Sequence, residues 1–167
     1  MRAGLALGSN IGDRFENLRA ARKAIVDLAE VSPPILASPI FETNPVACEP
    51  GAGLFWNAVL EIEFDGDARA LLKQLKQIEV SLGRPADHAR NVSRKIDIDL
   101  LYFGDMTIDE ADFQLPHPRM LSRKFVLQPL ADIRPELLLP GQTKTVRELL
   151  AQTTGSAKVV ALPEQWA

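Results

Sequence analysis

The sequence predicts a mixed α/β domain of the α+β type, in which short strands alternate with amphipathic helices. Residues 55–64 and 96–102 alternate apolar and polar side chains, as half-buried strands do, whereas residues 71–82 repeat apolar side chains at helical spacing. With 167 residues, 46% of them hydrophobic and 25% charged, the chain has the size and composition of one ordinary domain. We therefore expect residues 1–167 to form a single domain with a buried core.

The charge balance and the cysteine content exclude several classes of protein. A net charge of −3 gives no general attraction to nucleic acid or to an anionic membrane, so any anion site must be local. The single cysteine, Cys48, excludes an intramolecular disulfide and fits a reducing compartment. The chain has no apolar run of about 18 residues, and we expect its opening residues to form a short strand rather than a signal peptide. We expect a cytoplasmic monomer with small-molecule substrates, and neither nucleic acid nor membrane as partner.

The first unit is a strand, a glycine-rich turn and a helix. Arg2 to Leu7 is short and apolar, and Gly8-Ser9-Asn10 then opens a turn. Asp13, followed by Glu16, resembles a helix cap. The helical face is marked by Leu18, Ala21, Ile25 and Leu28. Backbone N–H groups in this turn could hold an anion, but small residues that join a strand to a helix need no ligand.

Prolines and a loop separate the helix from the next strands. Pro33-Pro34 is expected to end the helical region, and Ile35 to Thr43 reads as a strand that Pro39 confines to a sheet edge. Asn44 to Gly53 is long enough for a binding loop. The strand Phe55 to Phe64 follows, and one of its faces is core: Trp56, Ala58, Leu60, Ile62 and Phe64.

Phe55 and Asn57 lie on the other face of that strand, beside the loop. An aromatic plane next to an amide suits a flat heterocycle with donor and acceptor edges. A half-exposed aromatic next to a solvated asparagine explains the same residues equally well. This stretch alone does not decide between the two.

A second helix leads into a basic segment. Asp65-Gly66-Asp67 reads as a turn and cap, and the helix after it ends at Gly83. Glu79 borders the apolar face of this helix and could reach into a site, although a surface carboxylate is the commoner outcome at such a position. The segment from Arg84 to Lys95 carries four arginines or lysines against one acid, Asp87. This segment directly precedes the strand that carries the most information about function.

That strand carries two aspartates on one face. Alternation places three apolar side chains together, Ile96, Ile98 and Leu100. Asp97 and Asp99 share the opposite face, where two carboxylates repel each other unless a cation lies nearby. Oxygen ligands of this kind suit Mg²⁺, completed by water and substrate phosphates. The alternative is an edge strand whose polar face meets water, but the flanking Arg94 and Lys95 favour a phosphoryl-transfer site.

The remainder of the chain adds a second basic cluster and further elements. Gly104-Asp105 predicts a hairpin whose return strand is Met106 to Ile108. His117, like His88, lies beside basic residues and has no metal-ligand spacing. The second basic cluster consists of Arg119, Arg123 and Lys124. The last expected elements are a helix limited by Pro129 and Pro135, a helix opened by a Thr145–Glu148 capping box, and a strand at 159–162.

As a set and in this order, several short stretches resemble one family, the 6-hydroxymethyl-7,8-dihydropterin pyrophosphokinases of the folate pathway. They are Ala6-Leu7-Gly8-Ser9-Asn10, Thr43-Asn44-Pro45-Val46, Phe55-Trp56-Asn57, Gly83-Arg84, Arg94-x-x-Asp97-x-Asp99 and Pro116-His117-Pro118-Arg119-Met120. The resemblance runs from residue 3 to about residue 150. It implies a ferredoxin-like fold with a mainly antiparallel sheet flanked by helices. It also implies transfer of the diphosphate of ATP, the co-substrate, to the pterin hydroxymethyl group, with release of AMP.

The resemblance also implies roles for individual residues. Catalysis would rest on Arg84, Arg94, Asp97 and Asp99, with two Mg²⁺ ions held by the two aspartates. ATP would be contacted by Glu79, Arg84, Arg94, Leu100, His117 and Arg123. The pterin pocket would be formed by Thr43, Pro45, Val46, Phe55, Asn57 and Phe125. No general base is assigned, because metal binding can position and acidify a hydroxyl nucleophile.

The chain departs from the family pattern at four places. Asn91-Val92-Ser93 stands where the family often has Trp-Gly-Pro, and Ala86 stands where a second arginine is common, with Arg90 as a candidate replacement. Pro118 follows the histidine, and the pterin loop reads Thr-Asn-Pro rather than Thr-Pro-Pro.

Two rival functions were weighed against this resemblance. A nucleotidyltransferase would place its Gly-Ser and Asp-x-Asp elements close together, whereas Ser9 and Asp97 are 88 positions apart. The other rival is a non-catalytic ferredoxin-like module that binds a nucleotide or RNA as a sensor. The aromatic content of 6% and the negative net charge argue against RNA, and release of AMP would distinguish an enzyme from a nucleotide binder.

Overall fold

The computed structural model describes residues 1–46, 48–85, 92–154 and 157–166. The elements follow in the order β1 (Arg2–Ser9), α1 (Arg14–Val26), β2 (Val31–Ala37), β3 (Phe41–Thr43), β4 (Phe55–Phe64), α2 (Ala68–Ser81), β5 (Asp97–Phe103), β6 (Ile108–Glu110), β7 (Phe113–Leu115), the 3₁₀ turn η1 (Met120–Ser122), α3 (Lys124–Ile133), α4 (Val146–Gln152) and β8 (Val159–Ala161).

The main sheet has the strand order β5-β1-β4-β3-β8, and β2 also pairs with β4. All of these pairs are antiparallel. Strands β1, β2, β4 and β5, with α1 and α2 as the two crossovers, form a ferredoxin-like unit. This confirms the predicted fold class. Strands β3 and β8 extend the sheet, and β6 and β7 form a separate two-stranded ribbon.

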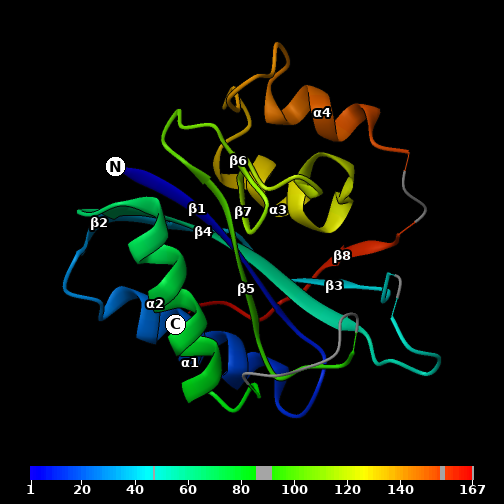
Figure 1. Ribbon diagram of the computed structural model, residues 1–167. Coiled ribbons are helices and arrows are strands. Elements are labelled where there is room, and N and C mark those ends of the chain that lie inside the picture. Colours follow the sequence, from blue (N-terminus) through cyan, green and yellow to red (C-terminus); the bar gives the residue numbers. More distant parts are fainter. Residues whose placement is uncertain (47, 86–91, 155–156, 167) are drawn as a thin grey trace.

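Helices α1 and α2 lie on one side of the sheet and α3 lies on the other, with α4 packed on α3 farther from the sheet (Figure 1). The first core packs α1 and α2 against the apolar faces of β1, β4 and β5. The second core packs α3 and α4 against Val59, Leu101 and Tyr102. The functional cavity lies on this second face, where the helices leave part of the sheet uncovered.

Predicted helix caps are present. Asp13 accepts a hydrogen bond from the Glu16 N–H at 3.0 Å, and Asp67 accepts one from the Ala70 N–H at 2.8 Å. Thr145 and Glu148 form the reciprocal capping box that opens α4. The turn that follows α2 contains Gly83 at φ +95°, a conformation that favours glycine. Local sequence signals therefore mark where these three helices begin and where α2 ends.

The prediction for Pro33-Pro34 was wrong. Both prolines lie inside β2 rather than closing the helical region, and the expected continuous strand to Thr43 is divided into β2 and β3. Strand β2 pairs only with β4, and its pairing is irregular between Ser32 and Leu36. Because the prolines occupy this irregular stretch of an edge strand, their missing N–H groups cost no regular ladder hydrogen bond.

Two further predictions failed in detail. The strand after Gly104-Asp105 does not return along β5, because β6 pairs with β7 instead. Pro129 does not limit the helix but lies within α3, which runs on to Ile133. Gly104 does adopt the positive φ expected of a turn, so the turn was predicted correctly and its partner strand was not.

The second face of β4 is more buried than its polar residues suggested. Glu61 is only 3% exposed. It accepts hydrogen bonds from the Tyr102 hydroxyl at 2.6 Å and from Arg134 Nε at 2.8 Å. Val59, on the same face, belongs to the second core. The expectation of a single core face on this strand is therefore corrected, since α3 covers the other face.

Strand β5 contains a β-bulge. Leu5 of β1 lies opposite Leu100 while Gly4 lies opposite Tyr102, so Leu101 is an extra residue in the ladder. Leu101 and Tyr102 therefore both contribute to the second core. A Cβ atom on Gly4 would lie 2.1 Å from the Tyr102 ring, so only glycine allows this close approach.

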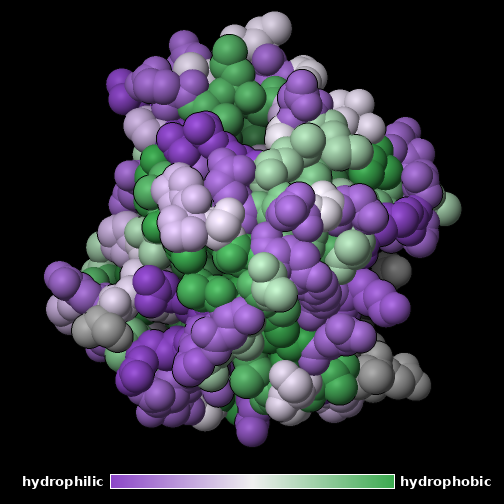
Figure 2. Space-filling view, turned by 90° about the vertical axis from the view of Figure 1, so that its left-hand side faces the viewer, coloured by the Kyte–Doolittle hydropathy of each residue, from purple (hydrophilic) through white to green (hydrophobic). Residues whose placement is uncertain are grey.

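The carboxyl-terminal segment crosses to the first face of the sheet. The Leu162 N–H donates to the Ile40 carbonyl at 2.8 Å, and Trp166 Nε1 donates to the Ser38 carbonyl at 2.6 Å. Among the described residues, no helix has the length and apolar character needed to cross a membrane. The face shown in Figure 2 mixes hydrophilic and hydrophobic side chains.

Candidate active site

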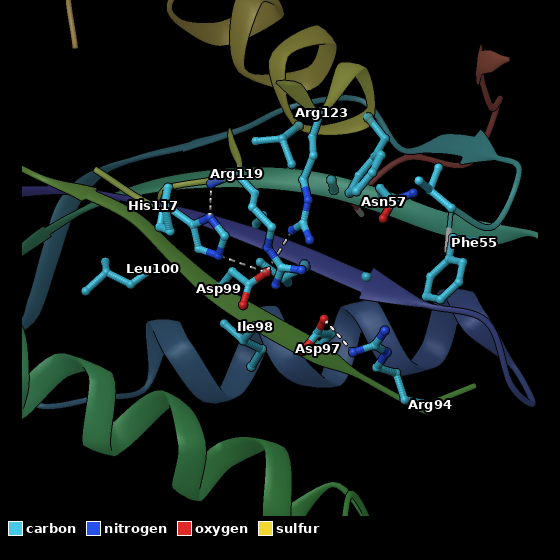
Figure 3. A pocket seen from close by; sticks show the side chains of 18 of the residues that line it. Phe55, Asn57, Arg94, Asp97, Ile98, Asp99, Leu100, His117, Arg119 and Arg123 are labelled. Atoms are coloured by element: carbon cyan, nitrogen blue, oxygen red, sulfur yellow. Dashed lines mark hydrogen bonds and ion pairs between the residues drawn. The ribbon is translucent and has the colours of Figure 1, made fainter. Parts of the chain in front are cut away.

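A cavity of about 660 Å³ lies among β1, β4, β5, the start of α3 and the neighbouring loops. It brings together residues from predicted motifs that lie far apart in the sequence. The predicted site residues that line it are Thr43, Val46, Phe55, Asn57, Arg84, Arg94, Asp97, Asp99, Leu100, His117, Arg123 and Phe125. Pro45 and Glu79 are not among the lining residues. Phe55 and Arg94 lie at one end of Figure 3, and Leu100 and His117 lie at the other.

Asp97 is paired with two arginines. Arg84 Nη1 binds Asp97 Oδ1, and Arg94 Nη1 lies 3.1 Å from Asp97 Oδ2. Burial raises the pKa of the Asp97 carboxyl, but the charges of Arg94 and Arg84 outweigh burial and lower this pKa below its usual value. Asp97 is therefore ionised at neutral pH. Strand β5, which alternation predicted, therefore places this carboxylate beside two arginine side chains.

Asp99 has looser partners. His117 Nε2 lies 3.9 Å from Asp99 Oδ2, and Arg123 Nη1 lies 3.7 Å from the same oxygen (Figure 3). Both distances exceed those of a hydrogen bond, so this carboxylate has unused acceptor capacity. Asp99 is accordingly the more available ligand of the two aspartates.

His117 is held as a neutral donor. Its Nδ1 accepts a hydrogen bond from the Arg119 N–H at 3.2 Å, so Nε2 carries the proton and faces Asp99. Burial lowers the pKa of His117, and the charges of Arg123 and Arg119 lower it further, against the opposing effect of Asp99. The sequence left the state of this histidine open, and the structure indicates a neutral imidazole with one free N–H.

Glu79 supports the site from behind. Its side chain is buried and accepts hydrogen bonds from Arg84 Nη1 at 2.5 Å and from the Ile98 N–H at 2.7 Å. Burial raises the pKa of Glu79. Glu79 does not reach into the cavity as expected, and its connection to the cavity runs through Arg84. Through these hydrogen bonds, Glu79 connects α2 to Arg84 and to β5.

Two arginine donors in the site have no acceptor. The Nε atoms of Arg84 and Arg94 are buried and make no hydrogen bond within the part of the chain that the structure describes. Buried donors without partners are rare in folded proteins because each costs free energy. Two such donors beside the same carboxylate indicate a place for an anion with several oxygens.

An aromatic and amide-rich region forms the other end of the cavity. Asn57 Nδ2 donates to Thr43 Oγ1 at 2.6 Å, which fixes the amide and leaves its oxygen available. The guanidinium of Arg94 lies 5.8 Å from the Phe55 ring, and that of Arg123 lies 5.5 Å from the Phe125 ring. A Cβ on Gly8 would lie 3.1 Å from Asn57 Oδ1, so the glycine keeps this region open.

Residues 4–135 match the family described as 7,8-dihydro-6-hydroxymethylpterin-pyrophosphokinase (HPPK). The chain belongs to the HPPK family. A Bacillus subtilis 2-amino-4-hydroxy-6-hydroxymethyldihydropteridine pyrophosphokinase is 42% identical over 129 residues, which cover 77% of this chain and 75% of that protein. A Dictyostelium discoideum protein named "Folic acid synthesis protein FOL1" is 36% identical over 95% of this chain.

Solved structures of the family share the fold. The structure titled "Crystal Structure Analysis of the HPPK-DHPS in complex with substrates" has a TM-score of 0.73 at 15% identity, over 90% of this chain. At that identity the likeness shows the fold alone. The chain spans 42% of that solved chain and 23% of the Dictyostelium protein. Both of those proteins are therefore much longer than the HPPK portion that they share with this chain.

Membership of the HPPK family makes the chain a pterin pyrophosphokinase of folate synthesis, an ATP-dependent diphosphotransferase with small-molecule substrates. The motifs that carried the resemblance fall around one cavity, as an enzyme of this class requires. Asp97 and Asp99 come from β5, and Phe55 and Asn57 come from β4.

The donor set of this HPPK site fits a hard divalent cation completed by substrate. Asp97 and Asp99 supply carboxylate oxygens from one face of β5. Within the described ranges, no group of three or more His, Cys, Asp or Glu side chains is arranged to hold a metal ion. Two protein carboxylates with water and phosphate oxygens match the coordination that Mg²⁺ prefers in nucleotide sites.

Sequence reasoning missed three residues of the HPPK site. Lys76 lines the cavity and its Nζ lies 3.0 Å from Glu79 Oε2. Its position three residues before Glu79 on a helix was the available signal. Arg119 also lines the cavity, although the sequence placed it only in a basic cluster. Asn10 contacts Arg94 from the turn after β1, a long-range contact that no spacing rule predicts.

Some predictions for this HPPK chain lie outside the described residues. They concern His88, Arg90, Ala86 and Asn91, the last two being departures from the family pattern. Pro118, another departure, is described and lines the cavity beside His117.

Proposed function

We propose that the chain transfers the β,γ-diphosphate of ATP to the hydroxymethyl group of 6-hydroxymethyl-7,8-dihydropterin and releases AMP. The hydroxymethyl oxygen bonds to the β-phosphorus, the bond from that phosphorus to the oxygen bridging the α-phosphate breaks, and the hydroxyl proton passes to solvent. The observation that carries this proposal is the pair of acceptor-free arginine Nε groups beside Asp97, in a cavity that also holds Phe55 and Asn57.

The pterin is proposed to bind at the aromatic end of the cavity. Phe55 and Phe125 supply apolar ring faces, and the Asn57 amide and Thr43 supply polar partners for the edge of the heterocycle. Val46 and the adjacent Pro45 complete this end from the loop after β3. A flat, polar-edged ring fits this combination better than a sugar or a peptide does.

ATP is proposed to occupy the middle and the opposite end. Arg84, Arg94 and Arg123 neutralise phosphate charge, and His117 donates its Nε2–H to a phosphate oxygen. Leu100 lies nearer the nucleoside, and Glu79 acts through Arg84. Holding the triphosphate by several fixed groups also aligns the β-phosphorus with the hydroxymethyl oxygen.

Asp97 and Asp99 are proposed to hold two Mg²⁺ ions together with the triphosphate. When bound, Mg²⁺ neutralises charge that develops on the phosphate oxygens. The two aspartates provide that site because both carboxylates are fixed on one face of a β-strand. The neighbouring arginines then remain available for the phosphate oxygens that the metal does not contact.

The proposal is tested by incubating the protein with MgATP and the pterin and resolving the nucleotide products. AMP formed in step with pterin diphosphate is the expected result. ADP in place of AMP would move the attack to the γ-phosphorus and contradict diphosphate transfer. ATP binding without any product would favour a non-catalytic nucleotide binder.

We also propose that residues 1–167 act as one unit, as a cytoplasmic monomer without a nucleic-acid or membrane partner. The net charge of −3 supports this because it offers no general attraction to polyanions. Light scattering after size-exclusion chromatography tests the oligomeric state, and a mass of twice the monomer would contradict it.

A further inference from the structure

Asn10, in the turn after β1, joins three segments that are far apart in the sequence. Its Oδ1 accepts a hydrogen bond from the Arg94 backbone N–H at 2.8 Å, and its own N–H donates to the Arg94 carbonyl at 3.2 Å. Its Nδ2 donates to Ser93 Oγ at 3.0 Å and to the Gly53 carbonyl at 3.4 Å. One residue thus links the end of β1, the loop before β4 and the segment before β5.

The position of Asn10 is itself fixed. Asn10 is 8% exposed and its neighbour Ser9 is fully buried. Asn17 of α1 donates to Ser9 Oγ at 3.1 Å and to the Ile11 carbonyl at 2.8 Å, which holds the turn from the helix side. An asparagine suits this position because its amide offers an acceptor and two donors on one short side chain.

The backbone that Asn10 holds carries the side chain of Arg94 into the site. Arg94 Nη1 lies 3.1 Å from Asp97 Oδ2, and its guanidinium lies 5.8 Å from the Phe55 ring. Its Nε is buried and has no acceptor among the residues that the structure describes. Both backbone polar groups of Arg94 pair with Asn10, so the starting point of this long side chain is fixed relative to β1.

We propose that Asn10 is a positioning residue that acts through Arg94. It holds the Arg94 backbone so that the guanidinium lies between the carboxylate and aromatic parts of the cavity. The proposal rests on the proposed function, in which Arg94 neutralises phosphate charge. It also replaces the anion-site interpretation of the turn, because the Asn10 N–H already donates to the Arg94 carbonyl.

Asn10→Ala removes the side-chain contacts and is expected to lower kcat about 10²-fold, the effect of a misplaced reacting group. The KM for the pterin should change less than about threefold, because the pterin-contacting residues are untouched. Hydrogen exchange, measured without substrates on a peptide covering residues 92–96, should become faster. Wild-type kcat together with unchanged exchange would overturn the proposal.

A double-mutant cycle separates positioning from general stability. If Asn10 acts through Arg94, Asn10→Ala should lower kcat less than about twofold further in the Arg94→Ala background. A full, independent loss in that background would overturn the proposal. Asn17→Ala is the matched control, since it loosens the same turn without touching Arg94, and it should keep kcat within about threefold of wild type.

A second variant covers the case in which Asn10→Ala fails to fold. Asn10→Asp keeps an acceptor for the Arg94 N–H and loses the donor to Ser93 and Gly53. It should retain the protection of residues 92–96 and keep kcat within about tenfold of wild type. A 10²-fold loss of kcat with full protection would overturn the proposal.

Failure of the proposed function is distinguishable from failure of this proposal. Absence of AMP with the wild-type protein would contradict the function. The positioning role of Asn10 would then be tested by the hydrogen-exchange result and by the affinity for a Mg-bound, non-hydrolysable ATP analogue. Weaker binding by both Asn10→Ala and Arg94→Ala would support positioning, and wild-type binding by Asn10→Ala would overturn it.

Discussion

Two clusters of charged and polar side chains share one face of the sheet and differ in how fully their groups are paired. Glu61, Tyr102 and Arg134 form one cluster under α3. Arg84, Arg94 and the two aspartates of β5 form the other, in the cavity. Both are built on the same strands, β4 and β5, or on segments beside them.

The first cluster is closed. Glu61 Oε1 accepts from Arg134, and Glu61 Oε2 accepts from the Tyr102 hydroxyl. None of the polar side-chain atoms in this cluster appears among the unpaired buried atoms of the described chain. A fully satisfied buried network fixes structure and has nothing left to offer a ligand.

The second cluster is open. Within residues 1–46, 48–85, 92–154 and 157–166, two arginine Nε donors lack acceptors, and the charged partners of Asp99 lie no closer than 3.7 and 3.9 Å. The cavity beside these groups has a volume of about 660 Å³. Burial alone therefore does not distinguish the two clusters, whereas unpaired donors next to the cavity do.

The largest expected effect comes from removing the carboxylates of the open cluster. Asp97→Asn or Asp99→Asn should lower kcat by about 10⁴-fold or more, because each loses a proposed metal ligand. Asp99→Asn should change the free energy of unfolding by less than about 1 kcal/mol, because its ion pairs are long. Steady-state kinetics at saturating Mg²⁺ and urea unfolding measure the two quantities.

Asp105→Asn, in the exposed turn after β5, is the control for those variants. It should keep the kcat and the free energy of unfolding of the wild type. Turnover by Asp97→Asn and Asp99→Asn equal to that of wild type would remove the metal assignment and the distinction between the two clusters.

The second expected effect concerns Arg94. Arg94→Ala should lower kcat on the order of 10³-fold, because it removes a cation from the transferring group. The dissociation constant of the pterin should rise less than about threefold. Arg147→Ala removes an exposed arginine and should leave both values unchanged. A large rise in the dissociation constant at normal kcat would instead assign Arg94 to the pterin end.

The third prediction breaks the closed cluster. Glu61→Ala should lower the free energy of unfolding by about 3 kcal/mol, because it leaves Arg134 and the buried Tyr102 hydroxyl without their acceptor. Values of kcat should stay close to wild type. Glu63→Ala, on the same face of β4, breaks a more exposed ion pair and should cost less than about 1 kcal/mol. A loss of turnover without a loss of stability would contradict the structural role of Glu61.

The smallest expected effect is a change in alkaline stability. Burial and the hydrogen bond to Glu61 raise the pKa of Tyr102 above its ordinary value of 10. The folded chain keeps the Tyr102 hydroxyl proton to a higher pH than the unfolded chain does. The contribution of the protonated hydroxyl to stability is therefore complete below pH 10 and decreases as the pH rises above 10. Tyr102→Phe should lose about 1 kcal/mol at pH 8.

The same variant should show a flatter loss of stability between about pH 9.5 and 11 than the wild type. Urea midpoints across that range provide the measurement, with far-UV circular dichroism as the signal. Parallel pH profiles for the two proteins would contradict the assignment of the alkaline slope to Tyr102.

Local patterns predicted the strands and helices that carry the site. Alternation placed Asp97 and Asp99 on one face of β5, and capping residues correctly marked the starts of α1, α2 and α4. The resemblance to the HPPK family then selected residues that the fold brings around one cavity. These successes depend on short-range signals and on motifs whose order in the chain is fixed.

Several failures depend on contacts between distant segments. Glu61 lies on the face of β4 that alternation did not assign to the core, because alternation does not reveal that α3 covers this face. Pro33 and Pro34 looked like a helix terminator because the irregular edge pairing of β2 is invisible in the sequence. Asn10 looked like part of a simple turn, although its partners lie 43 and 83 or 84 positions away.

The β-bulge in β5 separates the side-chain facing of the strand's first half from that of its second half. Leu101 is the inserted residue, and removing it would leave Asp99 and Leu100 before it, and Tyr102 and Phe103 after it, facing the sides they face now. An engineer could therefore transplant the aspartate half of the strand, or shorten the core half, without rotating the other.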